Sequence, residues 1–415
     1  MKSPHLPTAI SVVLSTALCV THSPALAAPF GAEVVESVPA PGQFINNPSY
    51  NDPADTLGPP TGGGTASPNN AAVLSLGGFG GSVVIRFDHP VTDDPGNYLG
   101  LDFIVFGNAS WWNQNPQLRW AEPAHVEIMR DVDSDGLPGT CPEEVWYLLP
   151  GSHTPDAGTW RAQTWDAVGG AAYPPANTAW FPEIGQFPYL PAGPCVIPLD
   201  AQGRYTTAAY EVDAAIYADP GSQGGTLGIV ANPNGGDGDP ANDAFEGLFG
   251  YADLSPTLRL GDFDADNTVD DPLADPESFY TVPDNPWRIG VTPGSGGGDA
   301  FDIADAVDPD TGAPAGLAAF DFVRVTTAVD LVLGPLGEVS AEIDAVADVA
   351  PVACPGDWNA DGQVNLVDLL HARNALGRED PDTGFSIAGD VVQDGVHDLA
   401  DVARLRAAHL GASCE

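Results

Sequence analysis

The sequence predicts a mainly β protein with a small helical module at its C-terminal end. The 415 residues include 48 glycines and 41 prolines, which favour many turns. Short runs of alternating apolar and polar residues recur between residues 82 and 347, whereas no long helical period occurs before residue 360. These observations predict a β-sandwich or jelly-roll-like main domain with loop insertions, followed by a compact α-helical module.

The first 28 residues have the pattern of a secretory signal peptide. Lys2 precedes an apolar run over residues 9–20, and Ala25-Leu26-Ala27 supplies a small-x-small cleavage pattern. The apolar run is shorter than the about 20 residues that are needed to span a bilayer. We therefore expect an exported chain, extracellular or at the bacterial cell surface, without a transmembrane segment. A retained N-terminal anchor is the alternative.

Residues 29–350 are expected to form the main domain. Its strand candidates share apolar–polar alternation between turn residues, and they are residues 82–87, 101–106, 125–129, 145–149, 320–326 and 342–347. The last two look like closing strands of the same sheet system. The stretch from about residue 151 to residue 286 is rich in loop-forming residues and predicts insertions on the sandwich. A second small β-domain is the alternative for that stretch.

A loop that follows the 101–106 strand candidate carries Trp111, Trp112 and Trp120 among asparagine and glutamine side chains. Tryptophan rings can stack on sugar rings while amides hydrogen-bond to sugar hydroxyls. These three residues are therefore candidates for binding a glycan. The alternative is that their rings fill the end of the sandwich.

Two acidic loops of the main domain have part of the spacing of a calcium loop. The first has Asp131, Asp133 and Asp135 at loop positions 1, 3 and 5, but Pro142 falls at position 12. The second has oxygen ligands at positions 1, 3, 5, 7 and 9, which are Asp262, Asp264, Asp266, Thr268 and Asp270. Both loops are candidate calcium sites. Asp-rich turns held by side-chain hydrogen bonds are the alternative.

The second of these loops also lacks an acid at position 12, where Leu273 stands. Asp271 or Asp275 is the candidate that could close its ligand set.

Residues 357–368 carry a complete calcium-loop spacing. Oxygen side chains stand at positions 1, 3, 5, 9 and 12, glycine stands at position 6, and a backbone carbonyl supplies position 7. The candidate ligands are Asp357, Asn359, Asp361, Gln363, Asn365 and Asp368. An apolar-faced helix follows and is expected to end at Gly377.

The same pattern returns between Asp390 and Asp401 and is again followed by a helix, through Leu410. Val392 stands at position 3, where a side-chain oxygen is expected, so this loop should bind calcium more weakly. Its candidate ligands are Asp390, Asp394, Val396, Asp398 and Asp401.

This tandem pair of loops, each followed by one helix, resembles the type I dockerin module of cellulosome-type proteins over residues 356–411. The resemblance implies an EF-hand-like module over residues 351–415, Ca²⁺ as cofactor, and a cohesin-like partner. Such dockerins commonly contact cohesin through a Ser-Thr pair at positions 10 and 11. This chain has Leu366-Val367 and Leu399-Ala400 there, so the identity of the partner stays open. A purely structural clasp is the alternative.

The cysteines outside the signal peptide are Cys141, Cys195, Cys354 and Cys414. An even number in an exported chain predicts disulfides. Because Cys354 and Cys414 bracket the compact module while the other two lie in the main domain, we predict the pairs Cys354–Cys414 and Cys141–Cys195.

The charge excludes nucleic acid as a partner, because 57 acidic residues face only 13 basic ones and the net charge is −44. The sequence has no H-E-x-x-H and no G-x-S-x-G motif, and we assign no catalytic residue. The main domain also resembles secreted bacterial surface proteins related to jelly-roll carbohydrate-binding modules. We therefore expect a secreted calcium-binding, non-catalytic sandwich that binds an extracellular glycan or surface ligand. A dockerin-borne polysaccharide hydrolase or lyase, and a surface-layer or adhesion component, are the alternatives.

Overall fold

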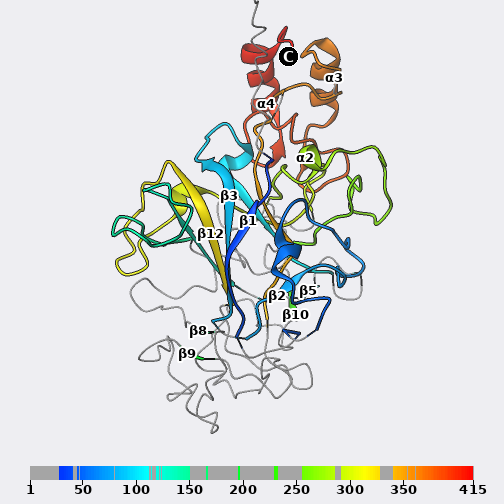
Figure 1. Cartoon of the computed structure of the whole chain (residues 1–415). Helices are drawn as coiled ribbons and strands as arrows, with labels where there is room; N and C mark the ends of the chain where they lie inside the picture. Colours follow the sequence, from blue (N-terminus) through cyan, green and yellow to red (C-terminus); the bar gives the residue numbers. More distant parts are fainter. Residues whose placement is uncertain are drawn as a thin grey trace, which may run out of the picture.

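The computed structural model of the chain describes residues 28–149, 255–285, 291–327 and 340–414, with short gaps at 41–43, 46, 79, 112–113, 115–117, 121, 123, 353 and 360. Between residues 150 and 254 it describes only the backbones of three short strands. Residues 1–27 of the predicted signal peptide and most of the predicted insertions therefore lie outside the described residues. The described part is mostly β, with several antiparallel sheets and few helices (Figure 1).

The larger sheet has five antiparallel strands, and β12 lies at its centre. In spatial order its strands are β1 (Glu33–Val38), β3 (Ser82–Thr92), β12 (Ala319–Thr327), β6 (Ala124–Met129) and β7 (Tyr147–Leu149). The register places Val325 of β12 between Val83 of β3 and Val126 of β6. Because side chains alternate across a strand, this register brings apolar side chains of three neighbouring strands to one face of the sheet.

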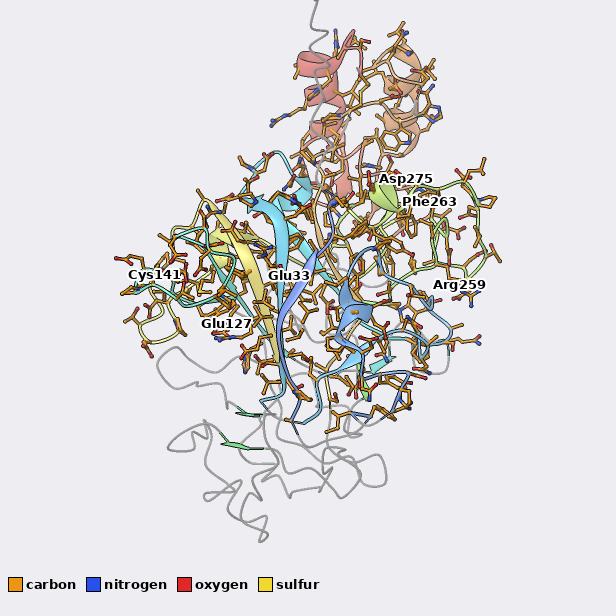
Figure 2. All side chains as sticks on the ribbon, in the orientation of Figure 1. Glu33, Glu127, Cys141, Arg259, Phe263 and Asp275 are labelled. Atoms are coloured by element: carbon orange, nitrogen blue, oxygen red, sulfur yellow. A yellow bond between two sulfur atoms is a disulfide. The ribbon has the colours of Figure 1, made fainter. Side chains whose placement is uncertain are left out.

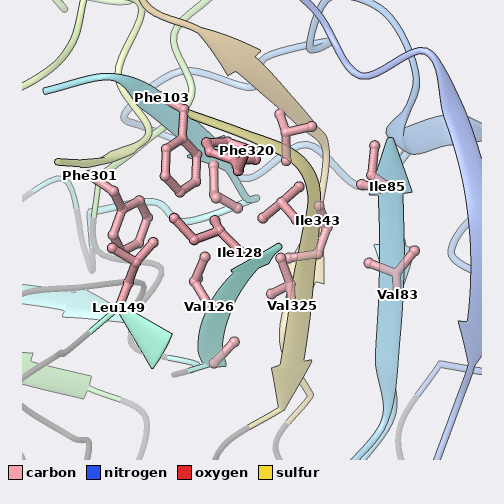
Figure 3. Close-up of a cluster of buried hydrophobic side chains, with 14 of the residues drawn as sticks. Val83, Ile85, Phe103, Val126, Ile128, Leu149, Phe301, Phe320, Val325 and Ile343 are labelled. Carbon is pink, nitrogen blue, oxygen red and sulfur yellow. The ribbon is translucent and has the colours of Figure 1, made fainter. Parts of the chain in front are cut away.

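The smaller sheet consists of β11 (Asp299–Phe301), β4 (Phe103–Phe106) and β14 (Ala345–Asp348). Its Phe103 and Phe301 rings stack with centroids 5.1 Å apart and belong to the same buried cluster as Val126 and Val325 of the larger sheet (Figure 3). One hydrophobic core therefore lies between two sheets, which is the arrangement of a β-sandwich.

The other face of the smaller sheet is covered by residues 255–285, a segment that contains α2 (Pro276–Phe279). Ile104 and Phe106 of β4 share a second buried cluster with Leu258, Phe279 and Tyr280 of this segment. Strand β4 is thus buried on both faces, which explains its unbroken apolar sequence. The covering segment also carries the acidic loop that begins at Asp262.

On the outer face of the larger sheet, Arg324 and Glu127 form a bidentate ion pair across neighbouring strands. Both nitrogen–oxygen distances are 2.7 Å, and the Arg324 guanidinium lies 4.2 Å from the centroid of the Trp146 ring. Glu127 is nearly fully buried (labelled in Figure 2), so the pair satisfies a charge that would otherwise be costly in this position.

The C-terminal module lies at one end of the molecule (Figure 1). It contains α3 (Leu366–Asn374), a short pairing of β15 (Arg378–Glu379) with β16 (Val396–His397), and α4 (Leu399–Arg404), which continues into the single turn η8 (Leu405–His409). None of the helices in the described residues is both long and apolar enough to cross a membrane.

Short elements complete the described structure. They are the 3₁₀ turns η1 (Pro53–Thr56), η2 (Tyr98–Gly100) and η6 (Ile303–Asp305), and the paired strands β2 (Leu74–Ser75) with β13 (Glu342–Ile343), β5 (Leu118–Trp120) with β10 (Ile229–Ala231), and β8 (Trp165–Asp166) with β9 (Cys195–Val196). Each strand expected from the sequence overlaps an observed one, and the 342–347 candidate is divided between β13 and β14, which lie in different sheets. The strands β1 and β11 of the two main sheets, and the short strands β2, β5, β8, β9, β10, β15 and β16, were not expected.

Candidate metal-binding loops and docking module

The first loop of the C-terminal module wraps around the carboxylate of Asp357. Its Oδ1 accepts the backbone N–H of Asp361 at 3.1 Å, and its Oδ2 accepts that of Gly362 at 2.8 Å. Gly362 has a φ of 81°, which favours glycine at loop position 6. Asp368 is fully buried and reaches back from the first turn of α3 to accept the N–H of Trp358 at 2.9 Å. Two carboxylates therefore fix the two ends of the loop.

The other expected ligands of this loop converge on Asp361. The Nδ2 atoms of Asn359 and Asn365 lie 3.0 and 3.4 Å from Asp361 Oδ2, and Asn365 Nδ2 also lies 3.4 Å from the carbonyl oxygen of Gln363. The donor set consists of carboxylate, amide and carbonyl groups, the hard oxygen ligands that Ca²⁺ prefers. Asn359 can turn its amide oxygen toward a cation in place of its NH₂ group, whereas the amide oxygen of Asn365 caps α3 by accepting the N–H of Val367 at 2.8 Å. The residues present therefore fit a calcium ion.

The second loop repeats this arrangement around Asp390. Its Oδ1 accepts the N–H of Asp394 at 3.2 Å and its Oδ2 accepts that of Gly395 at 2.8 Å. Asp401, buried in the first turn of α4, accepts the N–H of Val392 at 3.0 Å. The remaining candidate ligands lie between them, with Val396 donating its N–H to Asp394 Oδ1 and Asp398 at the N-cap of α4.

The second loop is also anchored to the β-sandwich. Tyr98 of η2 is buried, and its hydroxyl donates to Asp390 Oδ2 at 3.0 Å. Close by, Thr292 Oγ1 donates to Asp380 Oδ2 at 2.7 Å. Burial raises the pKa of Asp390 to about 6, although backbone amides and the Tyr98 hydroxyl donate to it. No sequence signal points to these contacts, because they join residues that are far apart in the chain.

The ends of the module are closed by a disulfide between Cys354 and Cys414, whose Cα atoms lie 5.5 Å apart. This confirms the predicted pairing. Residues 411–414 also pair with the first loop, since the N–H of Cys414 donates to the carbonyl of Gly362 and the N–H of Val364 donates to that of Ala412, both at 3.0 Å. The small core of the module is formed by Val364, Ala372, Val391 and Leu405.

The loop at residues 131–136 has the same pattern of hydrogen bonds. Asp131 accepts the N–H groups of Asp135 and Gly136 at 3.2 and 2.9 Å. Its closing carboxylate is Glu144, which is buried and accepts the N–H of Val132 at 3.1 Å. Glu144 stands two residues beyond loop position 12, so the spacing of a calcium loop does not predict it. Carboxylate oxygens of Asp131, Asp133 and Asp135 lie within 4.8 Å of one another, and a calcium site there stays a prediction.

The loop that begins at Asp262 is closed by Asp270. Phe263 donates its N–H to Asp270 Oδ2 at 3.0 Å, and Asn267, which stands at the glycine position, donates its N–H to Asp262 Oδ2 at 3.1 Å. The loop closes at position 9 because the N–H groups of residues 270 and 271 both bond to the carbonyl of Gly261.

The expected substitutes for the missing acid of this loop do not close it. Asp271 Oδ1 instead accepts the N–H of Leu273 at 2.8 Å, and Asp275 stands at the N-terminus of α2. Asp266 Oδ1 accepts the N–H of Thr268 at 2.7 Å, as Asp361 does from Gln363 in the module.

Among the three candidate glycan-binding tryptophans, Trp111 is the one whose side chain is described. This side chain is partly buried and packs against the cluster that contains Phe106 and Leu258, while the backbone N–H of Trp111 donates to the carbonyl of Thr65 at 3.0 Å. This position agrees with a ring that fills the end of the sandwich. Trp112 and the side chain of Trp120 lie outside the described residues.

Cys141 is a free, partly exposed thiol in this structure, which does not agree with the predicted Cys141–Cys195 pair. The Sγ atom of Cys141 lies within 4.8 Å of carboxylate oxygens of Asp133 and Glu144, and burial raises the pKa of this thiol. The side chain of Cys195 lies outside the described residues, so its own state stays a prediction.

The helices of the module present apolar side chains to solvent. Leu366 and Leu370 of α3 are 68% and 55% exposed, and Leu399 of α4 is 71% exposed. Leu366 and Leu399 stand at position 10 of their loops. These side chains are available to a partner rather than to the core of the module.

Residues 355–408 match the family model of the Dockerin type I domain. The matched range contains both loops and both helices described above, and it covers the C-terminal module alone. No curated protein matches the chain.

Proposed function

We propose that this chain is a secreted calcium-binding protein that attaches through its dockerin module to a cohesin-like partner and carries a non-catalytic β-sandwich. The observation that carries the proposal is the tandem pair of loops, in which Asp368 and Asp401 reach back from the following helices to the loops of Asp357 and Asp390. Calcium bound there would link each loop to the first turn of its helix and stabilise the folded module. Secretion is proposed from the signal-peptide pattern of residues 1–28.

The exposed faces of the helices indicate what kind of surface the partner offers. Leu366, Val367 and Leu370 leave an apolar patch on the start of α3. Burial of such side chains stabilises a complex by about 25 cal/mol per Å². We therefore expect a cohesin-like surface with an apolar patch, in place of one that hydrogen-bonds to hydroxyl groups.

The attachment can be tested with immobilised type I cohesin domains and the mature chain as analyte. We expect binding in millimolar calcium and its loss in chelator. Leu366→Arg together with Leu370→Arg should weaken binding at least about tenfold, because a charge would replace two apolar contacts. Leu273→Arg is the matched control, since this leucine of the sandwich is 89% exposed and lies outside the module. Cohesin binding that is unchanged both by removal of calcium and by the α3 double variant would refute the proposal.

For the β-sandwich we propose a binding role toward an extracellular glycan or surface ligand. The support is its sandwich architecture and the sequence that follows β4, in which Trp112 and Trp120 stand among asparagine and glutamine residues. Affinity electrophoresis in gels that contain soluble polysaccharides should show retardation of the mature chain in calcium.

Incubation of the mature chain with the same polysaccharides in calcium distinguishes this binding role from the alternative functions. New reducing ends or unsaturated sugars would identify a hydrolase or a lyase, and calcium-dependent self-association without glycan binding would identify a surface-layer or adhesion component.

A further inference from the structure

We propose that the loop Asp262–Asp270 of the β-sandwich is a calcium site in its own right, separate from the dockerin module. It lies in the segment that covers the smaller sheet, on the side of the molecule that carries α2; Phe263, which follows Asp262, is labelled in Figure 2. One carboxylate oxygen from each of Asp262, Asp264 and Asp270 lies within 4.8 Å of the other two.

The observation that points to a ligand is an oxygen without a partner. The Asp262 side chain is fully buried, and its Oδ1 has no hydrogen-bond partner, although its Oδ2 accepts the N–H of Asn267. A buried acceptor left unsatisfied costs about 1–3 kcal/mol, and more when it is charged. Two further carboxylates close by increase that cost by repulsion. A divalent cation would satisfy the buried oxygen and offset the repulsion together.

The chemistry of the surrounding groups favours Ca²⁺. The clustered donors are carboxylate oxygens, without sulfur or imidazole, which suits a hard cation that takes oxygen ligands. The loop also follows the geometry of the dockerin loops, since Ala265 and Asn267 at positions 4 and 6 both have positive φ, as do Gln393 and Gly395 in the module. Asp264 and Asp270 are exposed, so a cation can reach the site from solvent.

The ion would also fix a neighbouring part of the sandwich. The side chain of Asn267 accepts the N–H of Ala66 at 3.1 Å and donates to Thr65 Oγ1 at 2.6 Å. The carbonyl of Thr65 in turn accepts the N–H of Trp111. An ion that orders the acidic loop would therefore also order Thr65 and Ala66, and Thr65 is hydrogen-bonded to the backbone of Trp111.

The test is the calcium stoichiometry of the mature chain, measured by equilibrium dialysis and elemental analysis. Asp262→Asn should bind one ion fewer than the natural sequence. Asp271→Asn removes the same charge at the residue that directly follows the loop, whose carboxylate accepts the N–H of Leu273, and it should leave the stoichiometry unchanged. In the Asp357→Ala/Asp390→Ala background, which disables the dockerin loops, the ion of the sandwich should remain. Failure of the dockerin proposal is thereby distinguished from failure of this one.

Hydrogen exchange supplies a second readout. Calcium should slow exchange of the Ala66 amide in the natural sequence and not in Asp262→Asn. If Asp262→Asn does not fold, Asp264→Asn with Asp270→Asn changes only exposed residues and should weaken the site at least about tenfold. Unchanged stoichiometry and affinity in folded variants would overturn the proposal.

Discussion

At the scale of single residues, Val392 is what makes the second dockerin loop chemically different from the first. It stands at loop position 3, where the first loop has Asn359, and its backbone N–H donates to Asp401 Oδ1 at 3.0 Å. The backbone of the loop is therefore closed as in the first loop, while one side-chain oxygen is missing. Calcium affinity depends on the number and charge of the ligands, so the second loop should be the weaker one.

Replacing Val392 with Asp should raise the calcium affinity of the second loop by about tenfold, because it restores a ligand at position 3. Calorimetric titration of the mature chain measures the change. Gln393→Asp is the matched control: it adds the same charge at position 4, which supplies no ligand, and should produce a much smaller gain. Equal gains from both variants would show that net charge, and not the missing ligand, limits the second loop.

At the scale of elements, the module depends on a clasp that holds its two ends. The Cys354–Cys414 disulfide spans 60 residues, and residues 411–414 pair with the first dockerin loop. The buried core between α3 and α4 is small. Small units of this kind usually need a covalent or metal constraint to be stable.

Exchange of both cysteines for serine should destabilise the module by about 4 kcal/mol, the loop-closure entropy that a disulfide of this span removes from the unfolded chain. Hydrogen exchange of residues 355–414 in chelator measures the loss as faster exchange. Cys141→Ser, which removes a thiol of the sandwich, should not affect these residues. Unchanged protection in the double variant would mean that backbone pairing alone holds the clasp.

At the scale of the whole molecule, the net charge of −44 makes protons and cations part of the stability of the fold. Asp102 and Asp344 are buried within the sandwich and tie distant segments together: Asp102 accepts the N–H of Ile303, and Asp344 accepts those of Thr61 and Gly62. Burial raises the pKa of each to about 6, although these amides act in the opposite direction.

This pKa shift predicts an unusual dependence of stability on pH. An unfolded Asp has a pKa of about 3.9, so between pH 4 and 6 the folded chain binds more protons than the unfolded chain. The stabilisation is complete below about pH 4 and is lost as the pH rises through 6. In chelator, the melting temperature of the mature chain should therefore fall across this range, by about 2–4 °C for each kcal/mol lost.

Differential scanning calorimetry at fixed ionic strength measures that trend, and calcium at pH 7 should restore the melting temperature. A melting temperature in chelator that rises from pH 4 to pH 6 would contradict the prediction.

The local sequence was sufficient for the features whose groups lie close together in the chain. The ligand spacing from Asp357 to Asp368 is local, because a calcium loop of this kind draws its ligands from about a dozen consecutive residues. The structure accordingly brings these residues together, and the family match covers the same range. Apolar alternation likewise located β3, β6 and β12, since a strand half-buried in a sandwich has a side-chain period of two.

Tertiary structure alone decided which distant groups meet. β12 lies at the centre of the larger sheet between β3 and β6, although it follows them by a long stretch of chain. Glu144 closes its loop two residues beyond position 12, Asp270 closes its loop from position 9 in place of position 12, and Tyr98 joins the sandwich to the second dockerin loop. Such contacts are determined by the burial and hydrogen bonding of the whole chain, which periodicity and spacing along a sequence do not encode.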